Sequence, residues 1–248
     1  LCARNCRVPR SRGYCGVEES HIYSEMLHCG EEACLVPSNA VFLSGCNAAC
    51  VFCAASTASR DPSYGVVRSP AALARRIEVR RAEGARNVNF VGGEPTMHLP
   101  YILRALALVE GPLQVVWNSN AWLSATALDL LDGVADVYLL DWKFGNDACA
   151  MRMAALPNYT ATVAATMRRA VSQGELLVRH LVLPGHLDCC TRPVLENLRT
   201  VAPTATLSLM KHYHPSPQAS GELARELTLE EARQVRQLAI QLGFSLAR

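Results

Sequence analysis

Three cysteines, Cys46, Cys50 and Cys53, stand in the run GCNAACVFC with the spacing C-x3-C-x2-C. Short runs of cysteine thiolates hold iron–sulfur clusters, and three thiolates can bind three irons of a four-iron cubane. The fourth iron then has no protein ligand and is open for chemistry. A structural zinc site would require four ligands, and its cysteines more often come in C-x2-C pairs. The spacing therefore indicates a [4Fe-4S] cluster with one open iron.

The elements that would position these cysteines alternate between short apolar strands and helices. The strand candidates are nearly continuous apolar runs, as expected where both faces of a sheet are covered. Such alternation predicts a parallel α/β sheet, and we favour a partial (β/α)6-type TIM barrel over an open doubly wound sheet. The predicted strands are Ala40–Leu43, Val88–Val91, Gln114–Trp117, Val137–Leu140, Leu176–Leu183 and Thr206–Met210.

Capping residues indicate where the helices begin and end. Ser69 followed by Pro70 begins one helix, which Gly84 ends. Thr228 and Glu231 form the capping box of the last helix. Further helices are predicted over Pro100–Val109, from Ser124 to Gly133, and over Ala161–Ala170 and Pro193–Val201.

The beginning of the chain differs from the rest, because it is cysteine-rich and lacks periodicity. Residues 1–39 are therefore predicted to be a loop-rich extension, and residues 40–248 to be the barrel domain. Since the chain begins with Leu1 and not methionine, we expect the natural N-terminus to lie upstream.

The composition excludes several classes of protein. Half of the 248 residues are hydrophobic and the net charge is +2, which argues against a nucleic-acid partner or a membrane surface. No apolar run approaches the roughly 18 residues that a membrane span needs, and no signal peptide is recognisable. The chain is too long to need its 11 cysteines as disulfide staples. Reduced, metal-binding cysteines in a cytoplasmic protein fit better.

Polar or glycine-rich segments follow the predicted strands. The carboxyl ends of parallel strands meet at one edge of such a fold, so we expect these segments to form one polar site. In chain order they comprise the three cysteines, Gly92-Gly93-Glu94-Pro95-Thr96, Asn118-Ser119-Asn120, Asp141 with Lys143, Arg179 with His180, and His212-Tyr213-His214.

The cysteine run, the GGEPT segment and the strand order resemble the radical S-adenosylmethionine (SAM) superfamily. The segments VGGEPTMHLPYIL, DVYLLDWKF and LLVRHLVLPG are similar to the branch related to pyruvate formate-lyase activating enzymes. The resemblance implies that the open iron binds SAM and that an electron from the cluster cleaves it. The resulting 5′-deoxyadenosyl radical then abstracts hydrogen from a substrate.

The resemblance also implies roles for residues at the strand ends. Cys46, Cys50 and Cys53 would be the iron ligands. The remaining predicted cofactor contacts are Phe52 beside the adenine, Gly92, Gly93 and Glu94 near the methionine amino group, Asn118 and Asn120 near the ribose or carboxylate, His180 near the cofactor, Asp141 near a monovalent cation, and Lys143 near the methionine carboxylate.

Each of these residues also has a purely structural interpretation. The paired glycines alone would indicate a tight turn, and Asn118 and Asn120 could be turn formers. Asp141 and Lys143 could form a salt bridge, while His180 could be a hydrogen-bonded core histidine.

A second set of cysteines, Cys2, Cys6 and Cys15, could hold zinc or a second cluster. The fourth ligand would come from Cys29, from Cys34 or from a residue upstream. Ordinary small buried cysteines are the alternative. The remaining cysteines, Cys149, Cys189 and Cys190, show no spacing typical of a ligand set.

The expected substrate, by resemblance, is a protein or peptide, with glycyl-radical activation as the leading version. Modification of a ribosomal peptide or a small metabolite is an alternative, and a non-catalytic metal-binding scaffold is another. A reducing electron donor such as flavodoxin or ferredoxin is implied. Ala54 and Ala55 stand where the related branch often has a polar pair, so the substrate itself does not carry over.

Overall fold

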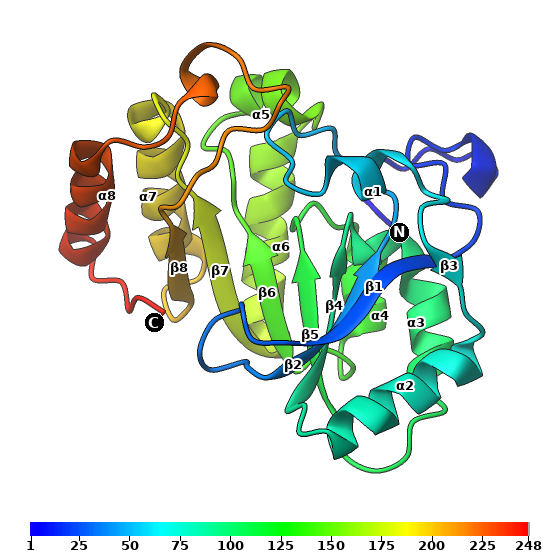
Figure 1. Cartoon of the computed structure of the whole chain (residues 1–248). Helices are drawn as coiled ribbons and strands as arrows, with labels where there is room; N and C mark the ends of the chain where they lie inside the picture. The colour runs from blue at the N-terminus through cyan, green and yellow to red at the C-terminus, as the bar shows by residue number, and fades with distance from the viewer. Residues whose placement is uncertain (248) are drawn as a thin grey trace. The chain divides into compact units, whose positions relative to one another are not determined.

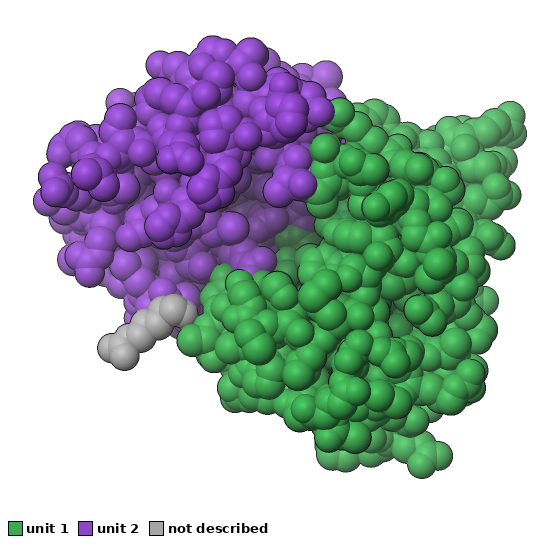
Figure 2. Space-filling model, viewed as in Figure 1, with its two compact units in different colours: residues 1–47, 55–119, 123–137 green, residues 48–54, 120–122, 138–248 purple. Residues whose placement is uncertain are grey.

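The computed structural model describes residues 1–247, and these residues form two compact units (Figures 1 and 2). Unit 1 consists of Leu1–Asn47, Ala55–Ser119 and Leu123–Val137. Unit 2 consists of Ala48–Ala54, Asn120–Trp122 and Tyr138–Arg248. The predicted boundary after residue 39 stays a prediction.

The strands follow the order β3-β1-β2-β4-β5-β6-β7-β8, and the sheet is not closed. This open arrangement agrees with the predicted partial barrel, and all six predicted strands are confirmed. Their bounds are β1 His21–His28, β2 Ser38–Leu43, β3 Val66–Val67, β4 Asn87–Gly92, β5 Gln114–Ser119, β6 Val137–Asp141, β7 Glu175–Leu181 and β8 Thr206–Met210.

The six predicted helices are also confirmed, and two short helices were not predicted. The Ser69 side chain accepts a hydrogen bond from the Ala72 amide, and the Thr228–Glu231 capping box is formed. The helices are α1 Ser56–Arg60, α2 Pro70–Ala82, α3 Leu99–Leu106, α4 Ala125–Leu131, α5 Asp147–Ala154, α6 Tyr159–Gln173, α7 Arg192–Val201 and α8 Leu229–Gln241; single turns are η1 Arg10–Arg12, η2 Pro95–His98, η3 Leu187–Thr191 and η4 Gly221–Ala224.

Unit 1 is built on parallel pairing of β2, β4 and β5, in which Val41 lies opposite Phe90 and Phe90 opposite Trp117. These three side chains are fully buried, as are Leu73 and Ile77 of α2. The register places the last residues of β2 and β4, Leu43 and Gly92, side by side. The segments that follow these two strands therefore begin next to each other.

The loop-rich extension predicted for residues 1–39 contains an unexpected strand. Strand β1 is eight residues long and pairs antiparallel with β2. Its mixture of polar and apolar side chains hides it from a search for continuous apolar runs, because only Ile22 of the strand is buried. Most of the rest of the segment is irregular, as predicted.

In unit 2, β7 pairs with β8 in parallel, and the helices α5 to α8 belong to the same unit (Figure 1). Its core contains Trp142, Phe144 and Tyr159, each at most 1% exposed. The outer side of β8 is paired as well, since the Leu207 amide donates to the Ser245 carbonyl and the Ala247 amide to the Leu207 carbonyl. Residues 245–247 thus lie along β8.

Candidate cofactor site and comparison with known proteins

The three predicted cluster ligands are reduced, partly exposed cysteines. Cys46 belongs to unit 1, whereas Cys50 and Cys53 belong to the segment Ala48–Ala54 of unit 2. Two backbone hydrogen bonds fix that segment to the end of α5, from the Ala49 amide to the Ala154 carbonyl and from the Val51 amide to the Met153 carbonyl, each 2.9 Å. The donor set therefore has the residue type and the accessibility that an iron–sulfur cluster requires.

In unit 1, the two glycines of the GGEPT segment allow close packing against the loop that leads to Cys46. The Gly93 amide donates to the Leu43 carbonyl at 2.7 Å, and the Glu94 amide to the Gly45 carbonyl at 3.0 Å. A Cβ on Gly92 would run into the Leu43 backbone, and one on Gly93 into the Gly45 backbone. Gly92 also has a φ of 123°, which favours glycine. The glycine pair thus has a steric role of its own, and the predicted contact to the methionine amino group stays a prediction.

Glu94 is fully buried and bonded to protein groups. Its Oε1 accepts hydrogen bonds from the Thr96 amide at 3.2 Å, from the Thr96 hydroxyl and from the Ser119 hydroxyl at 2.8 Å. The carboxylate therefore caps the turn η2 and connects it to the end of β5. Glu94 is therefore not a surface carboxylate.

His98, the last residue of η2, is not among the predicted site residues. It is fully buried, with Nδ1 2.9 Å from the Ser20 hydroxyl and Nε2 2.9 Å from the Ser44 carbonyl. Burial is the main cause that lowers the pKa of His98 to about 4, so the ring is neutral at pH 7. A neutral ring must donate from Nε2 to the carbonyl and accept at Nδ1. His98 thereby braces the residue two positions before Cys46.

Asn118, near the end of β5, is 6% exposed. Among the described residues, no group accepts a hydrogen bond from its Nδ2. A buried donor without a partner costs about 1–3 kcal/mol, and such groups call for an explanation. An unpaired donor at a strand end is what a polar cofactor would satisfy, so the residues present fit the predicted SAM site.

In unit 2, Lys143 forms an ion pair with Asp141, which confirms the salt-bridge interpretation. The two side chains are 16% and 24% exposed. Burial alone would lower the pKa of Lys143, but Asp141 and Cys50 raise it above its usual range. Burial raises the pKa of the Cys50 thiol to about 11, and the charge of Lys143 opposes that shift. The charge of Lys143 thus partly offsets the effect of burial on the Cys50 thiol.

Aromatic packing fixes the backbone on either side of this ion pair. The Lys143 amide donates to the Tyr159 hydroxyl at 2.8 Å. The Phe144 ring packs against Tyr159 and Phe52, with centroids 5.3 Å and 6.0 Å away. Phe52 is therefore a buried side chain of this cluster, and its predicted place beside an adenine stays a prediction.

His180 and Asn120 are both bonded to their own unit. The buried His180 ring places Nδ1 2.7 Å from the Trp142 carbonyl and Nε2 2.9 Å from the Thr191 hydroxyl. Burial lowers the pKa of His180 to about 4. Because both nitrogens are engaged, the core-histidine interpretation describes the ring. The Asn120 side chain accepts from the Trp122 amide at 3.0 Å, which confirms a turn-forming role.

The N-terminal cysteines do not converge on a single point. Cys2 and Cys15 are half-buried and Cys6 is exposed. Burial raises the pKa of the Cys2 thiol. Within residues 1–247, one group of three or more metal-ligating side chains has its ligand atoms close together, and it contains none of these cysteines. A second metal at Cys2, Cys6 and Cys15 stays a prediction.

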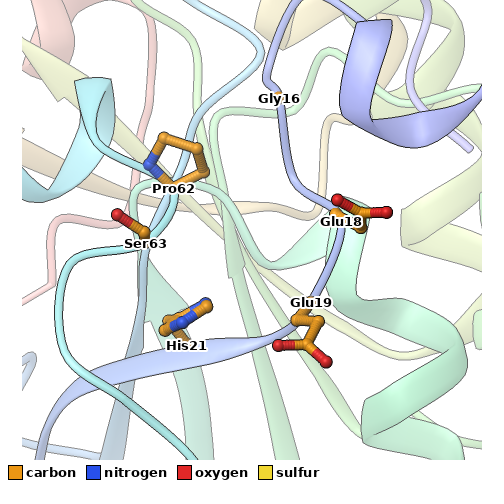
Figure 3. Close-up of a pocket in the computed structure, with 6 residues that line it drawn as sticks. All are labelled: Gly16, Glu18, Glu19, His21, Pro62 and Ser63. Carbon is orange, nitrogen blue, oxygen red and sulfur yellow. The ribbon is translucent and has the colours of Figure 1, made fainter.

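A hollow of about 420 Å³ opens on unit 1, and none of the predicted site residues lines it (Figure 3). Figure 3 shows Glu18, Glu19 and His21 on one segment, with Pro62 and Ser63 on a neighbouring segment. Glu18 and Glu19 are exposed, so the acidic groups belong to a solvated rim.

Comparison with known proteins decides the family. The model of the radical SAM superfamily matches residues 41–198, which include the three cysteines, the GGEPT segment and His180. The chain belongs to the radical SAM superfamily. The protein MJ0674 of Methanocaldococcus jannaschii is 38% identical over 256 residues, covering 99% of this chain and 75% of the relative. The predicted family is therefore confirmed.

Solved structures confirm the fold. A radical SAM methyltransferase from Sphaerobacter thermophilus has a TM-score of 0.61 at 16% identity, covering 84% of this radical SAM protein and 65% of its own chain. Streptococcus suis SuiB bound to S-adenosylmethionine has a TM-score of 0.59 at 11% identity, covering 83% of this chain and 51% of the SuiB chain. A domain of a Bacteroides vulgatus pyruvate-formate lyase-activating enzyme has a TM-score of 0.51 at 16% identity, covering 65% of this chain and 97% of that domain. The chain thus spans only part of the first two structures.

Family membership implies an enzyme that uses a [4Fe-4S] cluster and SAM, together with a substrate and a reductant. Within residues 1–247, no helix combines the length and the apolar character that a membrane span needs.

Proposed function

We propose that Cys46, Cys50 and Cys53 hold the [4Fe-4S] cluster of a radical SAM enzyme that acts on a protein or peptide in the manner of a glycyl-radical activase. The assignment of the cofactor site rests on the contact between two loops of unit 1. The GGEPT segment is hydrogen-bonded to the backbone leading to Cys46, so the glycine loop and the first cysteine are held together. The unpaired Asn118 donor nearby in the same unit supports it.

When bound, the cluster and SAM supply the reductive cleavage of SAM and the 5′-deoxyadenosyl radical that abstracts hydrogen. The chain supplies position and charge. The backbone of Gly92 and Gly93 would contact the methionine amino group, and Asn118 offers the ribose or carboxylate an unpaired amide donor. Asn120 and Phe52 would contact the sugar and the adenine.

The buried groups of unit 2 would set the charge around that cofactor. Lys143 offers a cation toward the methionine carboxylate, while Asp141 balances its charge and is predicted to lie near a monovalent cation. His180 acts as a positioning residue, because it holds the Trp142 carbonyl next to Lys143. Glu94 would act through η2 in the same way.

The protein or peptide substrate is supported by the names of two similar structures. One is a pyruvate-formate lyase-activating enzyme domain, and another is SuiB bound to the precursor peptide SuiA. Modification of a ribosomal peptide or a small metabolite is the alternative within enzymes. A flavodoxin or ferredoxin would provide the electron, and we propose a cytoplasmic location. Cys2, Cys6 and Cys15 would add a second metal.

The test is anaerobic reconstitution with iron and sulfide, followed by SAM and a reductant. We expect 5′-deoxyadenosine and about four irons per chain. Cys50→Ala should lose the iron and the product, whereas Ile240→Ala, an exposed change on α8, should keep both. Full turnover by Cys50→Ala would contradict the ligand assignment. Absence of the product from the wild-type protein would favour the scaffold alternative.

The substrate class is tested separately. With SAM deuterated at the 5′ carbon of its adenosyl group, or with a deuterated peptide, deuterium should exchange between the peptide and 5′-deoxyadenosine. A glycyl-radical enzyme as substrate should show a glycyl radical by electron paramagnetic resonance. Exchange only with small metabolites would overturn the protein or peptide assignment and leave the cofactor assignment intact.

A further inference from the structure

Four metal-ligating side chains that the proposed reaction does not use lie together in unit 2. They are Cys149, His186, Cys189 and Cys190, and their ligand atoms all lie within 4.8 Å of one another. Cys149 comes from the first turn of α5, His186 from the end of the loop after β7, and the vicinal pair from η3. All three cysteines are free.

The distances match one ion inside a tetrahedron. With zinc–sulfur bonds of about 2.3 Å and zinc–nitrogen bonds of about 2.0–2.1 Å, tetrahedral geometry separates two sulfurs by about 3.8 Å and a sulfur from a nitrogen by about 3.6 Å. The sulfur pairs Cys149–Cys189 and Cys189–Cys190 are 4.0 and 3.9 Å apart. The His186 Nδ1 lies 3.2 Å from Cys189 and 3.9 Å from Cys149.

Other uses of these thiols fit the distances poorly. A disulfide needs sulfurs about 2.05 Å apart, and joining one pair would leave the third thiol and the histidine without a purpose. A four-iron cubane puts an iron between each thiolate and the cluster centre, so its thiolates stand further apart than two ligands of one ion.

The surroundings of the thiols are those of a second ligand shell, which orients metal ligands and makes them better donors. The side-chain amide of Asn146 donates through Nδ2 to the Cys149 sulfur at 3.4 Å and to the Cys189 carbonyl at 2.7 Å. Arg152 donates to the same sulfur at 3.6 Å.

The backbone conformation allows the segment before α5 to lie against the turn η3. Gly145 permits the contact, since a Cβ there would come within 2.6 Å of the Cys190 carbonyl oxygen. The vicinal cysteines sit on a π-helical turn, in which the Thr191 amide donates to the His186 carbonyl. Such turns are rare and are frequent at functional sites. His186 also lines a hollow of about 320 Å³, which gives an ion a way in.

We infer that Cys149, His186, Cys189 and Cys190 bind one zinc ion in a closed, structural site that is separate from the cluster of the proposed function. Four protein ligands leave no position open for substrate. The ion joins the start of α5, which follows the loop that carries Lys143, to the turn whose Thr191 bonds to His180. It therefore stabilises the part of unit 2 that holds the predicted cofactor residues.

The experiment measures metal in the full-length Cys50→Ala variant, which removes the iron of the cluster from the analysis. We expect about one zinc per chain by elemental analysis. After chelation, cobalt should give the visible bands of a tetrahedral thiolate complex. Cys189→Ala and His186→Ala should lose the zinc and the cobalt bands.

A conservative variant keeps the test decisive if the alanine variants fail to fold. His186→Cys offers four thiolates and should retain zinc, with cobalt bands shifted by the added sulfur ligand. Met151→Ala, an exposed change on the same helix, should retain zinc unchanged. Zinc retained by His186→Ala and Cys189→Ala, or a zinc-free wild type with a disulfide among these cysteines by mass spectrometry, would overturn the inference. The readout is independent of SAM turnover.

Discussion

Unit 1 and unit 2 hold their predicted cofactor residues by different means. In unit 1, backbone amides and carbonyls bind each other directly, through glycines that permit close approach and a neutral histidine that bonds to the Ser44 carbonyl. In unit 2, the residues are held by a partly buried ion pair, an aromatic cluster and the cysteine–histidine group. The first arrangement tolerates no added volume, while the second depends on charge and coordination.

The largest effect that would test this contrast is expected for Gly92→Ala. The new Cβ would meet the Leu43 backbone at a φ of 123°, so strain and overpacking together should cost about 2–6 kcal/mol of unfolding free energy. Gly84→Ala is the matched control, because Gly84 has a φ of 101° and no atom within 4 Å. It should cost about 1–3 kcal/mol. Equal losses in chemical denaturation would show that the close approach is unimportant.

The second effect is a pH dependence contributed once by each unit. The pKa of His98 and that of His180 are lowered to about 4, so both rings take up a proton on unfolding below their ordinary pKa of about 6.5. Stability should therefore fall as the pH drops from about 6.5 to about 4, by about 3 kcal/mol for each histidine.

Substitutions separate the two contributions. His98→Gln keeps a donor for the Ser44 carbonyl, and His180→Asn keeps one for the Trp142 carbonyl. Each should remove about half of the slope in denaturation midpoints measured between pH 7 and pH 4. A slope left intact by both variants would mean that other groups titrate; the charged neighbours are Arg10 and His21 in unit 1, and Lys143 and Asp141 in unit 2.

A third, smaller effect belongs to unit 2 alone. Lys143→Met keeps the bulk of the side chain and leaves the Asp141 carboxylate without its cation. The loss should be about 1–3 kcal/mol of unfolding free energy. Lys211→Met changes the same residue type after β8 and should stay within about 0.5 kcal/mol. Similar losses of unfolding free energy for both lysine variants would show that the Lys143–Asp141 ion pair does not stabilise unit 2.

The smallest effect on stability is expected for Asn118→Ala in unit 1. Its amide donor has no partner to lose, so the unfolding free energy should change by less than about 1 kcal/mol. SAM binding to the cluster-loaded protein should weaken about tenfold, measured by equilibrium dialysis. Asn39, a buried asparagine near the start of β2 whose amide atoms are also unpaired, is the control. Unchanged SAM affinity in Asn118→Ala would exclude the predicted contact.

The sequence was sufficient for the parts of the fold that depend on local patterns. Continuous apolar runs predicted β2 and β4 to β8, and Ser69 and Thr228 predicted their helix starts, because strand burial and capping are encoded within a few residues. Strand β1 was missed because polar and apolar side chains are mixed along it and only Ile22 is buried. Helix α5 was missed because its Cys-Ala-Met-Arg-Met run has no clear apolar period.

Site residues were predictable by type but less so by role. Gly92 and Gly93 were expected to make room for a ligand, and they make room for the backbone of Leu43 and Gly45. The role of His98 depends on a contact with Ser44, which lies 54 residues away. Cys149 and Cys189 were set aside for lack of spacing, because 40 residues separate them and only folding brings them within 4.0 Å.

The pairing of residues 245–247 along β8 has a consequence for how this molecule meets others of its kind. An open sheet presents unpaired amides and carbonyls at its outermost strand, and such an edge can recruit a strand from another chain. The Leu207 amide and carbonyl are already occupied by Ser245 and Ala247. At the opposite end of the strand order, β3 is only two residues long. The β8 border is therefore a poor template for self-association and aggregation, whereas at the other border β3 pairs only with His21 and Ile22 of β1.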